Sequence, residues 1–170
     1  IVASGTNSSK PHAIPTDKKI EYGDIIVIDF GAKYNGYCAD MTRTIFVGEV
    51  NKEAEKLYNF LFEVQANETR KFLEGEDTKV IAKSVEYDLN QKNCTLIHAL
   101  GHGVGIDIHE KPILSVKSSS ILKNNMVVTN EPGIYIPGDI GIRIEDTIII
   151  NGRIPRILTN SSKQLTVIDG

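Results

Sequence analysis

Four acidic residues stand in paired apolar contexts from which they could bind metal ions together. Asp29 follows the apolar run IIVI, and Glu131 follows the similar run MVVTN. Asp40 begins the returning segment DMTRTIFV, and Glu145 lies at the corresponding place in IEDTIII. A carboxylate in such a context is costly to bury unless a cation neutralises it. One such acid alone would suit the exposed end of a strand, whereas four in matched contexts favour a shared cation site.

Three of the four histidines lie in one short stretch, HALGHGVGIDIHEKP (98–112). His98 and His102 are four residues apart, the spacing at which a helix presents two imidazoles to one zinc ion. Glycines at 101, 103 and 105 argue against a helix, because they suit close backbone approach and non-helical dihedrals. The stretch therefore predicts strand and turn, and only His102 is expected to join the acids as a ligand. For an isolated histidine of this kind, a buried ring bonded to a carbonyl is the alternative.

The charges and donor types of this set indicate a centre with two metal ions. Four carboxylates and one neutral imidazole carry a charge of −4, which two divalent cations would balance. Oxygen donors with one imidazole favour Mn²⁺, with Co²⁺, Fe²⁺ or Zn²⁺ as alternatives. Two ions that share a water molecule can lower its pKa from about 15.7 toward about 7. The chemistry that follows is hydrolysis.

The helices and strands predicted around these residues are typical of an α+β protein. Residues 24–31 and 38–48 predict two strands, and the Asn-Gly pair between them is a strong hairpin signal. Residues 52 to about 73 carry apolar side chains at helical spacing, and Asp77 can cap a second helix that runs to about Leu89. More strands are predicted beyond the second helix, over residues 125–136, 141–150 and 153–158. Strands, two helices and again strands indicate one domain, residues 1–170, with a mostly antiparallel sheet.

A faint internal repeat relates the two strand-rich regions. The segment GDIIVIDFG (23–31) aligns with NMVVTNEPG (125–133), and ADMTRTI (39–45) resembles IEDTIII (144–150). Each region thus has an acid at a strand end, a turn, and an acid on the returning strand. A match this short also arises by chance, but two such halves facing each other would bring four carboxylates together.

Composition excludes several classes of protein. Of the 170 residues, 41% are hydrophobic and 24% charged, which is typical of a globular protein. The net charge of −3 gives no sign of nucleic-acid binding, and no apolar run approaches the roughly 18 residues that a membrane helix needs. The two cysteines, Cys38 and Cys94, form no disulfide framework or metal motif, so free thiols in a reducing, cytoplasmic setting are expected.

Five motifs occur in an order that is specific for one family. They are the opening IVASGTNSSKPHAIPTDKKIEYGD, then IDFGAKYNGYCADMTRT, GHGVGIDIHEKP, EPGIYI and IRIEDT. With them the chain resembles the pita-bread metallopeptidases, and within these the branch of Xaa-Pro aminopeptidases and prolidases. The resemblance implies a curved, mostly antiparallel sheet with helices on its outer face and two pseudo-symmetric halves.

The resemblance also implies a role for each matching residue. Asp29 would hold one metal ion, His102 and Glu131 the other, and Asp40 and Glu145 would bridge the two. Glu131 would further serve as proton shuttle. His109 would contact the scissile carbonyl or the oxyanion, and His12 would lie near the substrate amide and leaving nitrogen. His98 would line the pocket for the residue after the cut. Arg143 and Tyr135 match pocket or supporting positions. For Arg143 a structural ion pair with an acid is an equal alternative.

Two departures from the family pattern matter for function. The chain starts at Ile1 without an initiator Met, so we expect a piece of a longer polypeptide whose N-terminal domain and first helices are absent. We expect the catalytic domain to be incomplete at its N-terminus and to lack homodimer contacts that the full-length protein would have. Some prolidases carry an Arg shortly after the HExP motif, thought to hold the carboxylate of a dipeptide, but Ile113 stands there in this chain.

The preferred hypothesis is a peptidase that cleaves the bond between an N-terminal residue and proline in longer peptides. Xaa-Pro dipeptidase (prolidase) activity is the first alternative. Methionine aminopeptidase is the second, although Glu131 and Glu145 lie closer together than the corresponding acids of those enzymes. A non-catalytic pita-bread binding module is the third, although all five ligand positions are filled here.

Overall fold

A long antiparallel hairpin carries the first pair of acids. The computed structural model describes residues 1–169. In it β2 (Ile25–Phe30) pairs with β5 (Met41–Val47), so that Asp29 lies opposite Thr42. The hairpin continues into β3 (Lys33–Tyr34) and β4 (Tyr37–Cys38) and closes at Asn35 and Gly36, whose φ angles are 49° and 87°. Positive φ at both central residues is the geometry that Asn-Gly favours, so the predicted hairpin is confirmed.

A second long hairpin carries the other pair. It consists of β8 (Val127–Asn130), β9 (Gly133–Tyr135), β10 (Gly141–Arg143) and β11 (Asp146–Ile149). Asn130 lies opposite Asp146, and Tyr135 opposite Gly141. The same register holds on both sides of the gap between them, so it places Glu131 opposite Glu145. Each predicted half therefore forms a hairpin with two acids near its middle.

The remaining strands extend the two hairpins into sheets. β6 (Gly101–Gly103), β7 (Glu110–Leu114) and β12 (Arg156–Ile157) join the second hairpin in the order β12-β11-β8-β6-β7. β1 (Val2–Ser4) and β13 (Thr166–Ile168) flank the first in the order β1-β2-β5-β13, with a 3₁₀ turn (Gly5–Ser9) after β1. Among the described residues every strand pair is antiparallel except β13 with β5, which agrees with the predicted sheet.

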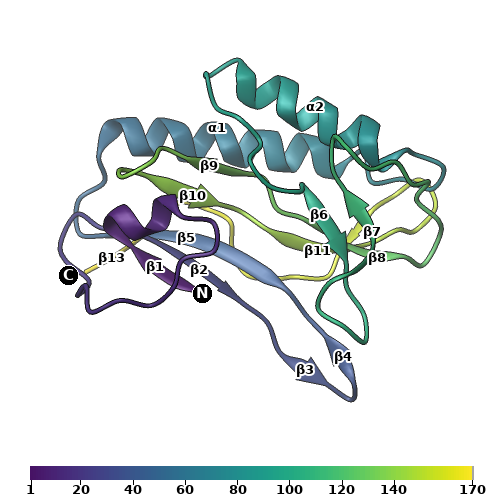
Figure 1. Ribbon diagram of the computed structural model, residues 1–170, viewed down its shortest axis with the longest axis horizontal. Coiled ribbons are helices and arrows are strands. Elements are labelled where there is room, and N and C mark those ends of the chain that lie inside the picture. Colours follow the sequence, from purple (N-terminus) through teal and green to yellow (C-terminus); the bar gives the residue numbers. More distant parts are fainter. Residues whose placement is uncertain (170) are drawn as a thin grey trace.

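Both helices lie on the same side of the sheets (Figure 1). α1 (Lys52–Thr69) begins after an Asn51 cap, and α2 (Thr78–Asn90) begins after Asp77, whose carboxylate accepts a hydrogen bond from the Lys79 amide as predicted. The prediction that the first helix reaches residue 73 was wrong. It ends at Thr69, where a tight turn places the fully buried Phe72 in the core. No helix in the described part of the chain is long and apolar enough to cross a membrane.

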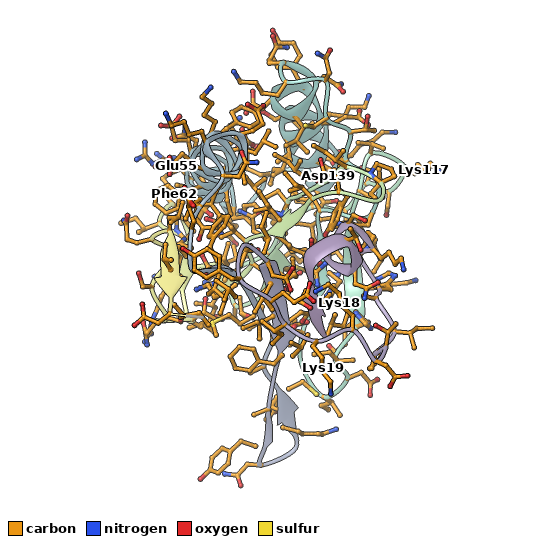
Figure 2. The ribbon with its side chains drawn as sticks, turned by 90° about the vertical axis from the view of Figure 1, so that its left-hand side faces the viewer. Lys18, Lys19, Glu55, Phe62, Lys117 and Asp139 are labelled. Carbon is orange, nitrogen blue, oxygen red and sulfur yellow. The ribbon has the colours of Figure 1, made fainter. Side chains whose placement is uncertain are left out.

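The core fills the space between helices and sheets. Figure 2 shows the two helices together above the strands, and the β3–β4 end of the first hairpin projecting on the far side. One cluster of buried side chains joins the two layers, including Leu61 and Tyr58 of α1, Val85 of α2, Phe46 of β5 and Ile148 of β11. Burial of such side chains contributes about 1.5–3 kcal/mol each. The hairpins are thus held rigidly from the helical side, and their acids lie on the opposite face.

Candidate metal centre

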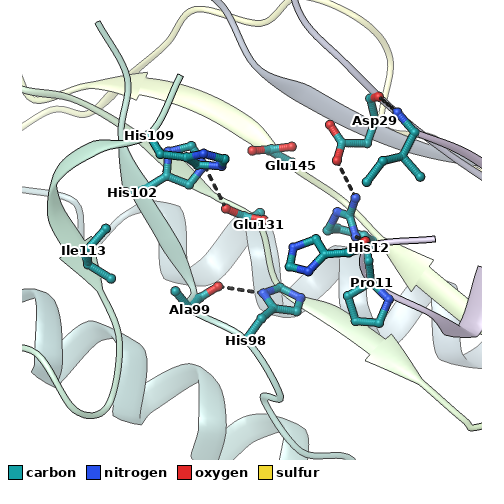
Figure 3. A pocket seen from close by; sticks show the side chains of 12 residues that line it. Pro11, His12, Asp29, His98, Ala99, His102, His109, Ile113, Glu131 and Glu145 are labelled. Atoms are coloured by element: carbon teal, nitrogen blue, oxygen red, sulfur yellow. Dashed lines mark hydrogen bonds and ion pairs between the residues drawn. The ribbon is translucent and has the colours of Figure 1, made fainter. Parts of the chain in front are cut away.

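A cavity of about 310 Å³ lies between the two hairpins and the β6–β7 region (Figure 3). Eight of the ten residues proposed from the sequence line it. They are His12, Asp29, His98, His102, His109, Glu131, Arg143 and Glu145. The other two are in contact with these, because Asp40 lies beside His102 and Tyr135 beside His98. Segments more than 100 residues apart in the chain therefore meet at one site.

Three ligand groups converge within this site. The ligand atoms of Asp40, His102 and Glu145 all lie within 4.8 Å of one another, and the three residues are buried. Nε2 of His102 lies 3.3 Å from Oε1 of Glu131 and 3.5 Å from Oδ2 of Asp40. Nδ1 of the same ring lies 3.0 Å from the carbonyl oxygen of Gly103, which can only accept a hydrogen bond. Nδ1 therefore carries the proton in the neutral ring, which leaves the lone pair of Nε2 available to a cation bound beside the carboxylates.

The glycines around His102 bring its backbone into place. A Cβ on Gly101 would lie 2.1 Å from the carbonyl oxygen of Thr129, and one on Gly103 would lie 2.4 Å from that of Lys111. Only glycine permits strands to approach this closely. This confirms strand and turn, rather than a helix, as the setting of the histidine stretch.

Glu145 has one carboxylate oxygen bonded and one free. Oε2 accepts a hydrogen bond of 2.6 Å from the hydroxyl of Thr42, whereas Oε1 is buried without a hydrogen-bond partner among the described residues. An unpaired buried carboxylate oxygen is unfavourable unless a cation contacts it. The free oxygen belongs to the group that converges with Asp40 and His102, which fits a bound cation there.

The electrostatics of the acids point to the same requirement. Burial, with the nearby charge of Asp29, raises the pKa of Asp40 to about 6. Burial, with the charges of Glu131 and Asp40, raises the pKa of Glu145 well above its usual value. Burial lowers the pKa of His102, but its hydrogen bonds with Glu131 and Gly103 outweigh this, and the net shift is upward. Such mutual repulsion among buried carboxylates is what a divalent cation relieves.

The fifth expected ligand, Asp29, faces a basic side chain instead. Its Oδ2 lies 2.6 Å from Nη2 of Arg143, which is buried. Arg143 also donates to the hydroxyl of Tyr135 at 2.8 Å and to the hydroxyl of Thr42 at 3.1 Å. Of the two roles left open for Arg143, the structure contains the ion pair.

The three remaining histidines, His12, His98 and His109, also line the cavity. Nδ1 of His98 donates to the carbonyl of Ala99 at 2.7 Å, so its Nε2 accepts from the hydroxyl of Tyr135 at 3.0 Å. Burial lowers the pKa of His98, and burial raises the pKa of Tyr135 to about 12. The His109 ring packs edge-on against the His102 ring at 4.4 Å between centroids. His12 enters from the loop after the 3₁₀ turn, as Figure 3 shows.

Two threonines of the site were not predicted from the sequence. Thr42 bonds Glu145 and Arg143, and Thr129 donates to Oε1 of Glu131 at 3.2 Å while accepting from the amide of His102 at 3.0 Å. Both have a signal in strand periodicity. Thr42 lies two residues after Asp40 and Thr129 two residues before Glu131, so each shares a face with an acid.

Residues 1–152 match the sequence model of metallopeptidase family M24. The chain belongs to this family. An Xaa-Pro dipeptidase of Pyrococcus furiosus is 43% identical to the M24 chain in an alignment of 170 positions, which covers 97% of this chain and 48% of that protein. Among solved structures, a prolidase of Thermococcus sibiricus has a TM-score of 0.95 at 40% identity and covers 99% of this chain and 46% of its own. An X-Pro aminopeptidase of Thermotoga maritima has a TM-score of 0.95 at 38% identity, covering 99% and 48%.

These similarities confirm the pita-bread fold expected of the M24 chain. The chain spans about half the length of the curated relatives it matches. The converging donors and the unpaired oxygen of Glu145 fit the divalent metal ions that a metallopeptidase family implies. The donors are carboxylate oxygens and an imidazole nitrogen, a set that suits Mn²⁺ and related ions.

Proposed function

We propose that the M24 chain is the catalytic part of a dinuclear metallopeptidase that hydrolyses the bond between an N-terminal residue and proline. We further propose that residues 1–170 form one catalytic domain that is incomplete at its N-terminus. The observation that carries this is the convergence of Asp40, His102 and Glu145, which has an unpaired carboxylate oxygen, beside a cavity lined by three more histidines. This arrangement places metal-binding groups next to groups that can bind a peptide.

In this proposal the two ions are held by five residues. Asp29 would help to hold one, His102 and Glu131 the other, and Asp40 and Glu145 would serve both. We propose Mn²⁺ as the ion, which would supply Lewis acidity and lower the pKa of a water molecule when bound. Asp29 would keep one carboxylate oxygen on Arg143, so the buried guanidinium orients this ligand.

The chain's own residues then handle the peptide and its proton. Glu131 accepts a proton from the attacking water and delivers it to the leaving nitrogen. His109, whose ring lies against that of His102, donates to the carbonyl oxygen as negative charge develops there. His12 contacts the substrate amide from the opposite side of the cavity.

A pocket for proline is a physical need of this reaction. Proline has no amide N–H and restricts the residue before it, so contacts that other peptidases use are missing. His98 and Tyr135 offer a rigid wall, since each is hydrogen-bonded and their ring centroids lie 5.4 Å apart. We assign the proline ring to this wall.

The choice between longer peptides and dipeptides rests on Ile113. This side chain lines the cavity, and an apolar residue there offers no partner for the carboxylate of a dipeptide. We therefore favour an Xaa-Pro aminopeptidase over a dipeptidase. Cys38 and Cys94 are both free, which suits a reducing compartment such as the cytoplasm, and we expect the intact protein to be a homodimer.

A panel of three peptides tests the proposal. The intact protein, supplied with Mn²⁺, is incubated with Ala-Pro, Ala-Pro-Ala and Met-Ala-Ser, and released amino acids are quantified. Release of alanine chiefly from Ala-Pro-Ala is expected. Preference for Ala-Pro would reassign the chain as a dipeptidase, and cleavage of Met-Ala-Ser alone would make it a methionine aminopeptidase. No cleavage of any peptide would leave the binding module as the better description.

A further inference from the structure

A buried polar network lies directly behind Glu145, on the face of the second hairpin away from the cavity. Its centre is Asp146, which is fully buried and forms the cross-strand pair with Asn130. Four side chains donate to its carboxylate. They are Arg43 at 2.8 Å, Thr159 at 2.6 Å, Gln65 at 2.9 Å, and Lys163. These interactions outweigh burial and lower the pKa of Asp146.

Arg43 connects this network to the backbone of the proposed metal ligand. Its guanidinium has five N–H groups, and each has an acceptor. Two are the carbonyl oxygens of Thr42 and Glu145, one is the carboxylate of Asp146, and two are the carbonyl oxygens of Ser161 and Ser162. Arg43 therefore links the first hairpin, the second hairpin and the C-terminal segment through hydrogen bonds from one side chain.

Glu145 is located from both sides by these contacts. Its amide donates to the carbonyl of Thr42 at 3.1 Å, its carbonyl accepts from Arg43, and its carboxylate accepts from the hydroxyl of Thr42. Oε1 of this carboxylate is left without a partner, and the carboxylate as a whole converges with Asp40 and His102. A small shift of Arg43 would move the main chain of Thr42 and Glu145 together and misalign this carboxylate.

Residues 159–163, here called the C-terminal strap, complete the network from outside the region that matches the family model, which ends at residue 152. The strap supplies the Thr159 hydroxyl, the Lys163 ammonium and two carbonyls, and β13 follows it along β5. We propose that Arg43, Asp146 and the strap position Glu145 for metal binding, so that metal affinity depends on strap residues that contact no ion. This rests on the proposed function, because it takes Glu145 as a ligand.

Calorimetric titration of the intact, metal-free protein with Mn²⁺ tests this, with the electron paramagnetic resonance signal of free Mn²⁺ as a second readout. The variants are Arg43→Lys, Lys163→Met and Thr159→Val, beside Glu145→Gln as the direct test of the ligand. Lys117→Met is the matched control, since Lys117 is exposed and lies at the opposite edge of the molecule from the C-terminal strand (Figure 2). Thermal unfolding in chelator is recorded for every variant.

We expect Arg43→Lys and Lys163→Met to weaken Mn²⁺ binding about 10-fold or more, the scale on which residues behind metal ligands act. Thr159→Val should weaken it less and Lys117→Met not at all. A purely structural network would instead lower the metal-free unfolding temperature and leave the affinity of the folded protein unchanged, which would overturn the inference. If Arg43→Lys does not fold, the two strap variants decide.

Glu145→Gln separates this inference from the proposed function. Weakened binding in Glu145→Gln with normal binding in the strap variants would overturn only the positioning role. Normal binding of two Mn²⁺ ions by Glu145→Gln would overturn the ligand assignment itself, and the positioning role with it.

Discussion

His98 and His102 use the same local device to present their rings. Each donates its Nδ1 proton to the carbonyl of the next residue, at 2.7 and 3.0 Å. In the neutral rings Nε2 is therefore unprotonated: in His98 it accepts from the hydroxyl of Tyr135, and in His102, beside Glu131 and Asp40, it is available to a cation. The two histidines thus have the same tautomer but different neighbours at Nε2. The spacing of four residues alone would suit a shared zinc ion, whereas the backbone directs the two rings to different partners.

Glu131→Gln tests the proton transfer assigned to this residue. The amide keeps the size of the side chain but cannot accept a proton, so kcat on Ala-Pro-Ala should fall about 10²- to 10⁴-fold. Because Glu131 is also a proposed ligand, Mn²⁺ stoichiometry is measured in parallel. Glu63→Gln, at an exposed position of α1, is the control. Unchanged kcat in Glu131→Gln would remove it from the mechanism.

Ile113→Arg tests the basis of the peptide-length preference. A guanidinium on the cavity wall could pair with the carboxylate of a bound dipeptide, so the ratio of kcat/KM for Ala-Pro over Ala-Pro-Ala should rise about 10-fold or more. Ile113→Leu keeps an apolar wall and should leave the ratio unchanged. An unaltered ratio in Ile113→Arg would show that this position does not select substrates.

At the scale of elements, the two hairpins each bring two acids and β6 brings the histidine. In the second hairpin Glu131 and Glu145 lie directly opposite each other, whereas in the first Asp29 lies opposite Thr42, and Asp40 is displaced by two residues along the strand. Both arrangements keep the two acids on one face, since side chains alternate along a strand. Both hairpins therefore present two acids on one face, although the acids pair across the strands differently.

Gly101→Ala should disrupt the placement of β6. Its Cβ would lie 2.1 Å from a main-chain oxygen of β8, which cannot move without breaking the sheet. We expect a loss of several kcal/mol in the free energy of unfolding, the scale of other overpacked cores, and weaker Mn²⁺ binding through His102. Gly138→Ala is the control, because it has open space but a φ of +75° and should cost about 1 kcal/mol. Equal losses in the two variants, measured by denaturant unfolding in chelator, would contradict the close-approach argument.

The elements that the sequence predicts are those with local signals. The Asn35-Gly36 hairpin, the Asp77 cap and the apolar runs of both hairpins are all signals carried by neighbouring residues. β1 and β13 are three residues each and exist through pairing with distant β2 and β5, so no local pattern marks them. The site follows the same rule. Its acids and histidines can be recognised from their residue types and sequence contexts. The Asp29–Arg143 pair and the Arg43 network cannot, because they depend on contacts between residues more than 100 apart in sequence.

In the whole molecule, the site draws on segments from near the N-terminus to near the C-terminus of the chain. It gathers an N-terminal loop, two hairpins, the β6–β7 region and, behind it, the C-terminal strap. Concentrating four carboxylates at this junction costs stability when no cation is bound. The apolar core on the helical side must therefore offset this loss of stability in the metal-free protein.

This cost predicts how metal-free stability changes with pH. The pKa of Asp40 is about 6 in the folded protein against 3.8 for an ordinary Asp, so the folded state binds more protons between these values. Its contribution to the free energy of unfolding therefore falls as pH rises from about 4 to 6. Asp40→Asn should flatten this part of the curve, measured by denaturant unfolding in chelator. A steeper fall in the variant would contradict the assignment.

Metal should reverse the trend in the wild-type protein. Ligand carboxylates must lose their protons before they bind a cation, so added Mn²⁺ should raise the unfolding temperature more at pH 7.5 than at pH 5. At 100 times its Kd the ion contributes about 2.7 kcal/mol. Equal stabilisation at both pH values would mean that Mn²⁺ binds elsewhere.

We propose that two divalent ions bind to Asp29, Asp40, His102, Glu131 and Glu145. Anomalous diffraction from crystals of the intact protein soaked in Mn²⁺ tests this assignment. We predict two peaks in the cavity, one bounded by Asp29 and the other by His102 and Glu131, with Asp40 and Glu145 contacting both. A single peak, or peaks away from these five residues, would contradict the claim.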